Sequence, residues 1–130
     1  IVPSTTGAAE AVTEAIPALA GKFDGLALRV PILTGSIADI TFIAKRPTTV
    51  EEVNKILTEA SFTPRWRDIF AVTTEPLVSA DIVGSRHASI ADLGLTKVVG
   101  GNLVKVMAWY DNEMGYTHTL VQHVIKTGLV

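Results

Sequence analysis

The sequence predicts an α+β fold, in which a mostly antiparallel sheet is covered by helices on one face and is followed by a C-terminal helix. Several short segments alternate apolar with polar residues, which is typical of half-buried strands. Three other segments repeat their apolar residues at helical spacing. Two adjacent glycines at 100 and 101 provide a tight hairpin turn. Strands joined mainly by hairpins, with helices between groups of strands, favour this fold class.

The first helix is predicted to begin at a threonine cap, either Thr5 or Thr6, and to continue to about Leu19. Pro17 has no backbone N–H, so we expect it to kink or shorten the last turn. A short strand is predicted at 26–30, because apolar residues surround one arginine there and a proline follows.

The turn at 34–36 leads to a longer strand at 37–45, in which two sets of side chains alternate. The second helix has a clear start signal, because Thr49 and Glu52 have the spacing of a capping box. Its apolar stripe consists of Val53, Ile56, Leu57 and Ala60. A loop is expected at 61–68.

Short strands are expected in the second half of the chain, where β-branched and apolar residues cluster between turn signals. They are predicted at 69–72, 82–83, 89–93 and 96–99. The Gly100-Gly101 turn joins the last of these to a final strand, which ends at Tyr110.

The last helix is predicted from about Asn112 to Lys126, with Gly128 as its C-cap. Asp111 or Asn112 caps its beginning, and Glu113 adds negative charge to the first turn. A polar corner between a strand and a helix is also a place where an amide side chain can offer a ligand both a donor and an acceptor.

The composition indicates a chain whose surface is partly covered by other polypeptide. It has 130 residues, 48% of them hydrophobic, and a mean hydropathy of +0.37. No apolar run reaches the roughly 18 residues of a membrane span. The high content of hydrophobic residues therefore indicates a surface that another domain or subunit covers. The net charge is −2, and no basic patch indicates nucleic acid. The start lacks an initiator methionine and a signal pattern, so we expect a segment of a longer chain.

The sequence offers little for several common chemistries. It contains no cysteine, which excludes disulfides, thiolate metal sites and cysteine catalysis within these residues. His118 and His123 are five residues apart and face different sides of a helix, so a shared metal is not expected. One polar cluster lacks the Gly-x-Ser-x-Gly turn of hydrolases. It consists of Ser85, His87, Ser89 and Asp92.

Three places have the chemistry to bind a ligand, and each has a structural alternative. Thr6 and Gly7 precede a helix whose free N–H groups attract anions, although an ordinary cap has the same pattern. Arg29 offers planar, bidentate donors to phosphate, although it also fits the solvated face of a strand. Asn112 is either a ligand contact or a helix cap.

Four segments occur in the order expected for a known family. The string WYDNEMGY at 109–116 resembles the C-terminal signature of the phosphorylating glyceraldehyde-3-phosphate dehydrogenases. Segments 3–9, 26–31 and 77–84 resemble earlier parts of the same family. The resemblance covers the chain from end to end but only the back portion of the family's full-length chain, and it implies the same α+β architecture.

The resemblance implies a role for each candidate residue. Thr6 and Gly7 match a pair that contacts inorganic phosphate, and Arg29 matches an arginine that serves both the substrate phosphate and inorganic phosphate. Asn112 matches the residue that holds the nicotinamide carboxamide. Tyr116 would pack near the same ring, with burial at a domain interface as the alternative. No residue of this chain matches the family's catalytic cysteine and histidine, which would lie upstream.

The resemblance also implies a division of the chain and its partners. Residues 1–111 would be part of a catalytic, phosphate-binding domain, and residues 112–130 a helix that packs on an absent NAD-binding domain. The complete enzyme would be a cytoplasmic homotetramer using NAD, glyceraldehyde 3-phosphate and inorganic phosphate. We expect this chain alone to be inactive and not to bind NAD. The alternative is an independent, non-catalytic interaction module or an isolated subdomain.

Overall fold

The chain has the predicted α+β architecture. The computed structural model describes residues 1–129, which form two compact units, residues 1–33 and residues 34–129. The first unit is a two-stranded ribbon with short helices, and the second contains a four-stranded sheet.

The first unit contains a strand that the sequence did not predict. Strand β1 (Val2–Ser4) pairs antiparallel with β2 (Ala27–Arg29). Helix α1 (Ala8–Ala15) and the 3₁₀ helix η1 (Pro17–Leu19) lie between them in the sequence. The expected shortening at the proline is therefore confirmed, because the α-helix ends before it and a 3₁₀ turn begins with it. β1 is short and contains a proline, so only its pairing with a distant segment identifies it as a strand.

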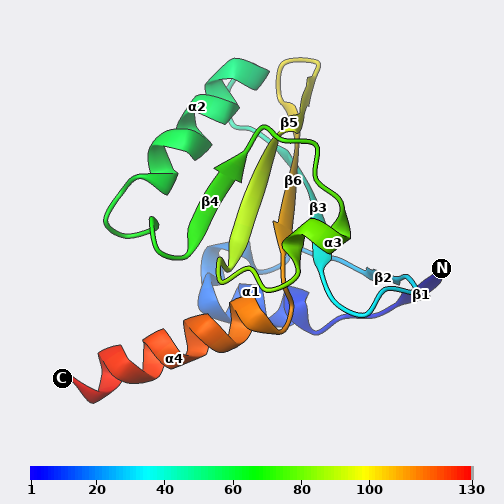
Figure 1. Ribbon diagram of the computed structural model, residues 1–130. Helices are drawn as coiled ribbons and strands as arrows, with labels where there is room; N and C mark the ends of the chain where they lie inside the picture. The colour runs from blue at the N-terminus through cyan, green and yellow to red at the C-terminus, as the bar shows by residue number, and fades with distance from the viewer. Residues whose placement is uncertain (130) are drawn as a thin grey trace. The chain divides into compact units, whose positions relative to one another are not determined.

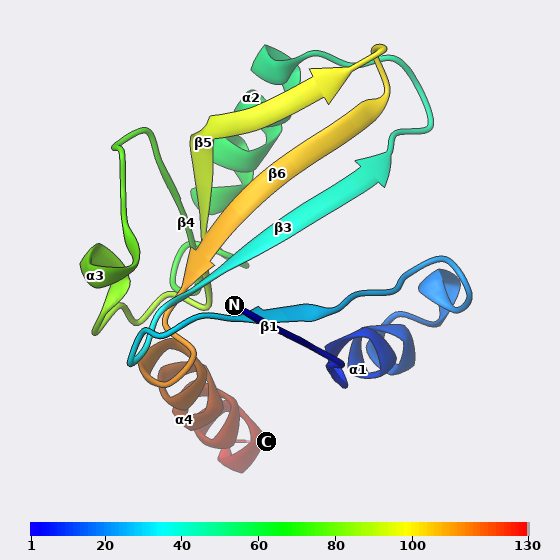
Figure 2. The ribbon, with the colours of Figure 1, turned by 90° about the vertical axis from the view of Figure 1, so that its right-hand side faces the viewer.

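The sheet of the second unit has the strand order β3-β6-β5-β4. The strands are β3 (Ser36–Ile43), β4 (Phe70–Thr73), β5 (Ser89–Val99) and β6 (Leu103–Tyr110). Every neighbouring pair is antiparallel except β4 and β5, which are parallel. Helix α2 (Val50–Ser61) covers one face, as Figures 1 and 2 show from two directions. The mostly antiparallel sheet is thus confirmed.

The alternation predicted for the last strand is confirmed by its burial. Val104, Val106 and Ala108 on β6 are buried, whereas Leu103 at its start is exposed. Partly buried side chains from the neighbouring strands and α2 pack against the core formed by Ala91, Val104 and Val106. These side chains are Ala44, Val53, Leu57, Phe70, Val72 and Val98.

Helix α2 begins as predicted, but with only half of the capping box. The Thr49 hydroxyl accepts a hydrogen bond from the Glu52 N–H at 3.2 Å. The Glu52 carboxylate instead accepts hydrogen bonds from the Arg46 guanidinium and, at 2.7 Å, from the Thr48 hydroxyl. These bonds stabilise the charged carboxylate and lower the pKa of Glu52 to about 2.

Two strand predictions in the second half are corrected. Residues 82–83 are not a strand, because Ile82 ends the short helix α3 (Ser79–Ile82). The Asp81 carboxylate accepts the Val78 N–H at 2.8 Å and so favours a helical turn. The segments 89–93 and 96–99 form one strand, β5, with a bulge between Asp92 and Lys97.

The predicted glycine turn joins β5 to β6. Gly100 and Gly101 have φ angles of +61° and +79°, which favour glycine, and the Asn102 N–H donates to the Val99 carbonyl at 3.3 Å. Val99 pairs with Leu103, so the connection has one residue more than the two that were predicted.

Helix α4 (Met114–Gly128) differs from the prediction at both ends. It begins two residues later than expected, and Gly128 is its last residue, not its C-cap. It extends away from the end of β6 (Figure 1). Its apolar side chains are half exposed, and they include Met114, Val121, Val124 and Ile125. Among the helices of residues 1–129, none is long and apolar enough to cross a membrane.

Candidate functional site

The corner between β6 and α4 is organised around a buried carboxylate, that of Asp111. Asp111 is only 3% exposed, and its Oδ1 accepts the N–H groups of Glu113 and Met114 at 2.8 and 2.9 Å. Its Oδ2 accepts the Gly84 N–H at 2.8 Å. The N-cap residue of α4 is Glu113, so neither Asp111 nor Asn112 is the N-cap residue that the sequence predicted, although the Asp111 carboxylate accepts the N–H groups of Glu113 and Met114. Hydrogen bonds from the backbone of Gly84, Met114 and Glu113 lower the pKa of Asp111.

Asn112 is held by a separate segment of the chain. Its Oδ1 accepts the Gly35 N–H at 3.0 Å and lies 3.3 and 3.4 Å from the hydroxyls of Thr34 and Ser36. Within residues 1–129 its amide nitrogen donates no hydrogen bond. The carbonyl end of the amide is thus fixed, and both N–H donors remain available to a ligand.

Only glycine fits at position 35, where the backbone binds Asn112 and also approaches Ser79 closely. Its φ angle is +92°, and a Cβ atom at this position would lie 2.9 Å from the Ser79 carbonyl oxygen. The sequence predicted a turn at 34–36, but it gave no signal that the turn binds Asn112. The two segments are more than 70 residues apart, so only the pairing of β3 with β6 brings them together.

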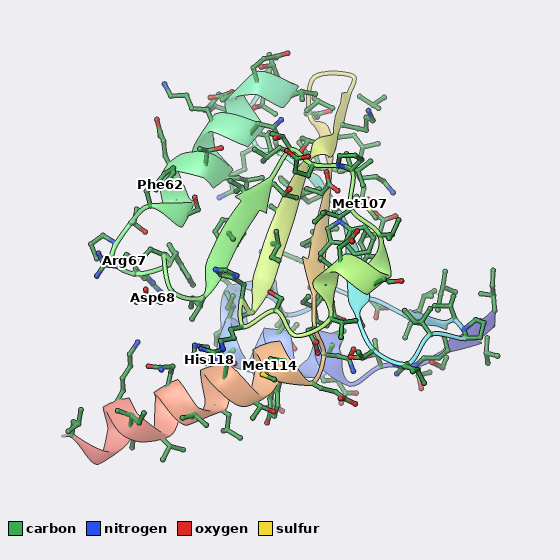
Figure 3. The ribbon with its side chains drawn as sticks, in the orientation of Figure 1. Phe62, Arg67, Asp68, Met107, Met114 and His118 are labelled. Atoms are coloured by element: carbon green, nitrogen blue, oxygen red, sulfur yellow. The ribbon has the colours of Figure 1, made fainter. Side chains whose placement is uncertain are left out.

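The first turn of α4 lies close to the loop before β5. A Cβ atom on Gly115 would lie 2.6 Å from the His87 carbonyl oxygen, so only glycine fits this approach. Figure 3 shows Met114 at the start of α4 and His118 one turn later. Tyr116 lies between them and is 66% exposed, so it is not buried within this chain.

The candidate anion site belongs to the first unit. The N-cap of α1 is Gly7, and neither Thr5 nor Thr6 is the N-cap residue that the sequence predicted. The Thr6 hydroxyl instead accepts the Ala8 N–H at 3.2 Å. No heavy atom lies within 4 Å of the Cβ position at Gly7, so the space beside this backbone is open.

Arg29 lies on the strand beside the segment that leads to this helix. It is the last residue of β2 and pairs with Val2, while Ser4 pairs with Ala27. Directly paired residues lie on the same face of a ribbon, and so do residues two apart on one strand. Val2, the partner of Arg29, and Ser4 therefore lie on the same face as Arg29. Its exposed guanidinium makes no hydrogen bond or ion pair with the rest of residues 1–129. Its convergence with Thr6 and Gly7 on one anion stays a prediction.

The polar cluster of Ser85, His87, Ser89 and Asp92 makes structural hydrogen bonds. The buried Asp92 carboxylate accepts the Trp109 indole N–H at 3.0 Å and the Gly94 N–H at 3.1 Å. The Ser85 hydroxyl oxygen faces the His87 backbone N–H at 3.4 Å. These contacts are structural, and the described part of the chain has no group of three or more His, Asp or Glu side chains that could hold a metal ion.

Comparison with known proteins gives one consistent result. The family model described as "Glyceraldehyde 3-phosphate dehydrogenase, C-terminal domain" matches residues 1–112. The chain is similar to the glyceraldehyde-3-phosphate dehydrogenases of Clostridium acetobutylicum, with 49% identity over 125 residues, and of Mycobacterium avium, with 48% over 128 residues. These alignments cover 94% and 98% of the chain but only 36% and 37% of the relatives.

Proposed function

The chain belongs to the glyceraldehyde-3-phosphate dehydrogenase family, and we propose that it is the part of an NAD-dependent, phosphorylating oxidoreductase that holds phosphate and contacts nicotinamide. The observation that carries the proposal is the Asn112 amide, fixed at the end of β6 with both N–H donors available. It lies within the segment that resembles the family signature.

Asn112 is the proposed contact of the nicotinamide carboxamide. Its Oδ1 already accepts the Gly35 N–H, so its Nδ2 is the end that faces a ligand. An amide N–H donates to a carboxamide oxygen, and a fixed amide favours one orientation of the ring. NAD, when bound to the complete enzyme, accepts the hydride. Tyr116 is the second proposed contact, because it lies in the first turn of α4 and is exposed.

Thr6, Gly7 and Arg29 are the proposed phosphate site. A guanidinium stays charged at neutral pH and offers two parallel donors to phosphate oxygens. The N–H groups at the start of α1 and the helix dipole add further attraction for an anion. The open space beside Gly7 and the free Arg29 guanidinium support this role.

The remaining chemistry is proposed to come from upstream polypeptide. The family's covalent step needs a thiolate, and this chain contains no cysteine. An apolar groove between α2 and β3 supports such a partner, because Ile40, Phe42 and Ile56 in its lining are 42%, 46% and 54% exposed. We propose that the upstream part covers such surfaces in a cytoplasmic homotetramer, and that α4 packs on its NAD-binding domain.

Substitutions in the full-length enzyme test the two sites separately. Arg29→Gln removes a charge-assisted contact and should raise the KM for phosphate about tenfold to a hundredfold, with the KM for NAD unchanged. Asn112→Ala should raise the KM for NAD and not that for phosphate. Arg67→Gln is the matched control, because Arg67 lies in the exposed connection after α2, away from α4 (Figure 3). An unchanged phosphate KM in Arg29→Gln would refute the phosphate role.

The 130-residue chain alone should form no NADH from glyceraldehyde 3-phosphate, NAD and phosphate above a no-protein control. NADH formation would overturn the assignment of the covalent chemistry to upstream residues. The intact mass of the native protein separates the proposal from the alternative of an independent module. A mass near that of the chain itself, 13.8 kDa, would favour the module.

A further inference from the structure

A buried carboxylate next to the proposed nicotinamide contact has no role in the function described so far. We propose that Asp111 is a positioning residue, which determines the direction of the Asn112 amide by tying three segments of the chain to one point. This inference rests on the proposed role of Asn112.

The Asp111 carboxylate joins elements that are distant in the sequence. It accepts one N–H from Gly84, in the connection that follows α3, and two from Glu113 and Met114 at the start of α4. Because Asn112 lies between the carboxylate and the two N–H groups of α4, its backbone is enclosed in a short hydrogen-bonded loop. The Cα–Cβ direction of Asn112 therefore depends on this carboxylate.

The Thr34 hydroxyl links the two side chains directly. Its Oγ1 lies 3.2 Å from Asp111 Oδ1 and 3.3 Å from Asn112 Oδ1. A hydroxyl has a single proton, so it donates to one of these oxygens at a time. Thr34 thus connects the turn at 34–36, which binds the Asn112 amide, to Asp111, whose carboxylate fixes the Asn112 backbone.

The chemistry of this pocket favours a charged carboxylate over an amide. All four groups that face Asp111 are donors, namely three backbone N–H groups and one hydroxyl. An asparagine in this place would direct its own NH₂ group toward one of these donors. Two donors would then face each other, so the backbone between β6 and α4 would shift, although the side chain has almost the same size.

The test is Asp111→Asn in the full-length enzyme. The KM for NAD should rise by up to about tenfold, since a displaced Asn112 amide loses about one neutral hydrogen bond to the nicotinamide, and the KM for phosphate should stay unchanged. Asp92→Asn is the matched control, because Asp92 is also buried and also accepts two N–H groups, but it does not contact Asn112. A purely structural role would reduce the active fraction in both variants without changing the KM for NAD.

The double variant decides whether Asp111 acts through Asn112. Asp111→Asn combined with Asn112→Ala should have the same KM for NAD as Asn112→Ala alone. If the two substitutions instead have additive effects on the KM for NAD, the inference is overturned. It is also overturned if Asp111→Asn and Asp92→Asn have the same KM for NAD. If Asp111→Asn does not fold, Thr34→Val removes only the linking hydroxyl, and the KM for NAD should rise about threefold. An unchanged value there would equally overturn the inference.

The same measurements separate this inference from the proposed function. If Asn112→Ala leaves the KM for NAD unchanged, the nicotinamide role of Asn112 is wrong and the inference falls with it. If Asn112→Ala raises the KM for NAD and Asp111→Asn does not, only the positioning role is wrong.

Discussion

Replacing Gly35 with alanine tests the contact on which the Asn112 geometry depends. Gly35 has a φ angle of +92°, and its added Cβ would lie 2.9 Å from the Ser79 carbonyl oxygen. The left-handed backbone costs an alanine about 1–2 kcal/mol. The close contact with a backbone atom adds about 1–3 kcal/mol, because neither partner is a flexible side chain. We therefore expect Gly35→Ala to lower the free energy of unfolding by about 2–5 kcal/mol.

Gly100→Ala is the matched control for this substitution. Gly100 also has a positive φ angle, +61°, but its Cβ position has no heavy atom within 4 Å. The difference between the two variants isolates the contact with Ser79 and should be about 1–3 kcal/mol. Urea unfolding followed by tryptophan fluorescence measures both values, since Trp109 lies in the same sheet.

A functional readout accompanies the stability measurement. We expect relief of the contact to shift the Gly35 backbone and to weaken its hydrogen bond to Asn112 Oδ1, so Gly35→Ala in the full-length enzyme should raise the KM for NAD. Gly100→Ala should not. If the two variants are equally stable and have equal KM values, the close approach of Gly35 to Ser79 does not exist in solution and the reasoning is refuted.

Two further predictions concern stability. Thr49→Ala removes the side-chain cap of α2 and should lower the free energy of unfolding by about 1 kcal/mol in urea, whereas Thr127→Ala, near the end of α4, should change it little. The folded-state pKa of Glu52 is about 2, below the ordinary value of 4.5, and that of Asp111 is also lowered. The stabilising contribution of Glu52 is therefore complete above about pH 5 and is lost as the pH falls toward about 2, and the lowered pKa of Asp111 makes its contribution fall with decreasing pH as well. Glu52→Gln should flatten the pH dependence of unfolding in this window, and an unchanged curve would contradict the assignment.

Local signals in the sequence were sufficient for much of the second unit. The alternation on β6, the cap at Thr49 and the turn at Gly100 depend on residues within one element, so the sequence displays them directly. The fold class follows from these elements. The interruption at Pro17 was predictable for the same reason, because proline acts on its own turn.

Features that depend on distant partners were not predictable in this way. β1 exists through its pairing with β2, and the parallel pairing of β4 with β5 has no local signal. The apolar pair at 82–83 resembled a strand, but the Asp81 carboxylate closes a helical turn there.

In the candidate site, too, the features with a local signal were predictable and those that depend on distant residues were not. The chemistry of Asn112 and its corner was readable from residue types, and the resemblance supplied a role. Its support by Gly35 required the pairing of β3 with β6, and the burial of Asp111 required the approach of Gly84 from a separate loop. The residue types therefore indicated Asn112 as a contact and Asp111 as a possible cap, but they did not indicate that Gly35 and Gly84 bind these two side chains.

A crystal structure of the full-length enzyme with inorganic phosphate would show whether the proposed phosphate site exists. We expect one anion within hydrogen-bonding distance of the Thr6 hydroxyl, the Gly7 backbone N–H and the Arg29 guanidinium. When NAD is added, we also expect the Asn112 amide nitrogen to face the nicotinamide. An Arg29 guanidinium directed away from the start of α1, with phosphate bound elsewhere, would show that Thr6, Gly7 and Arg29 do not form a phosphate site.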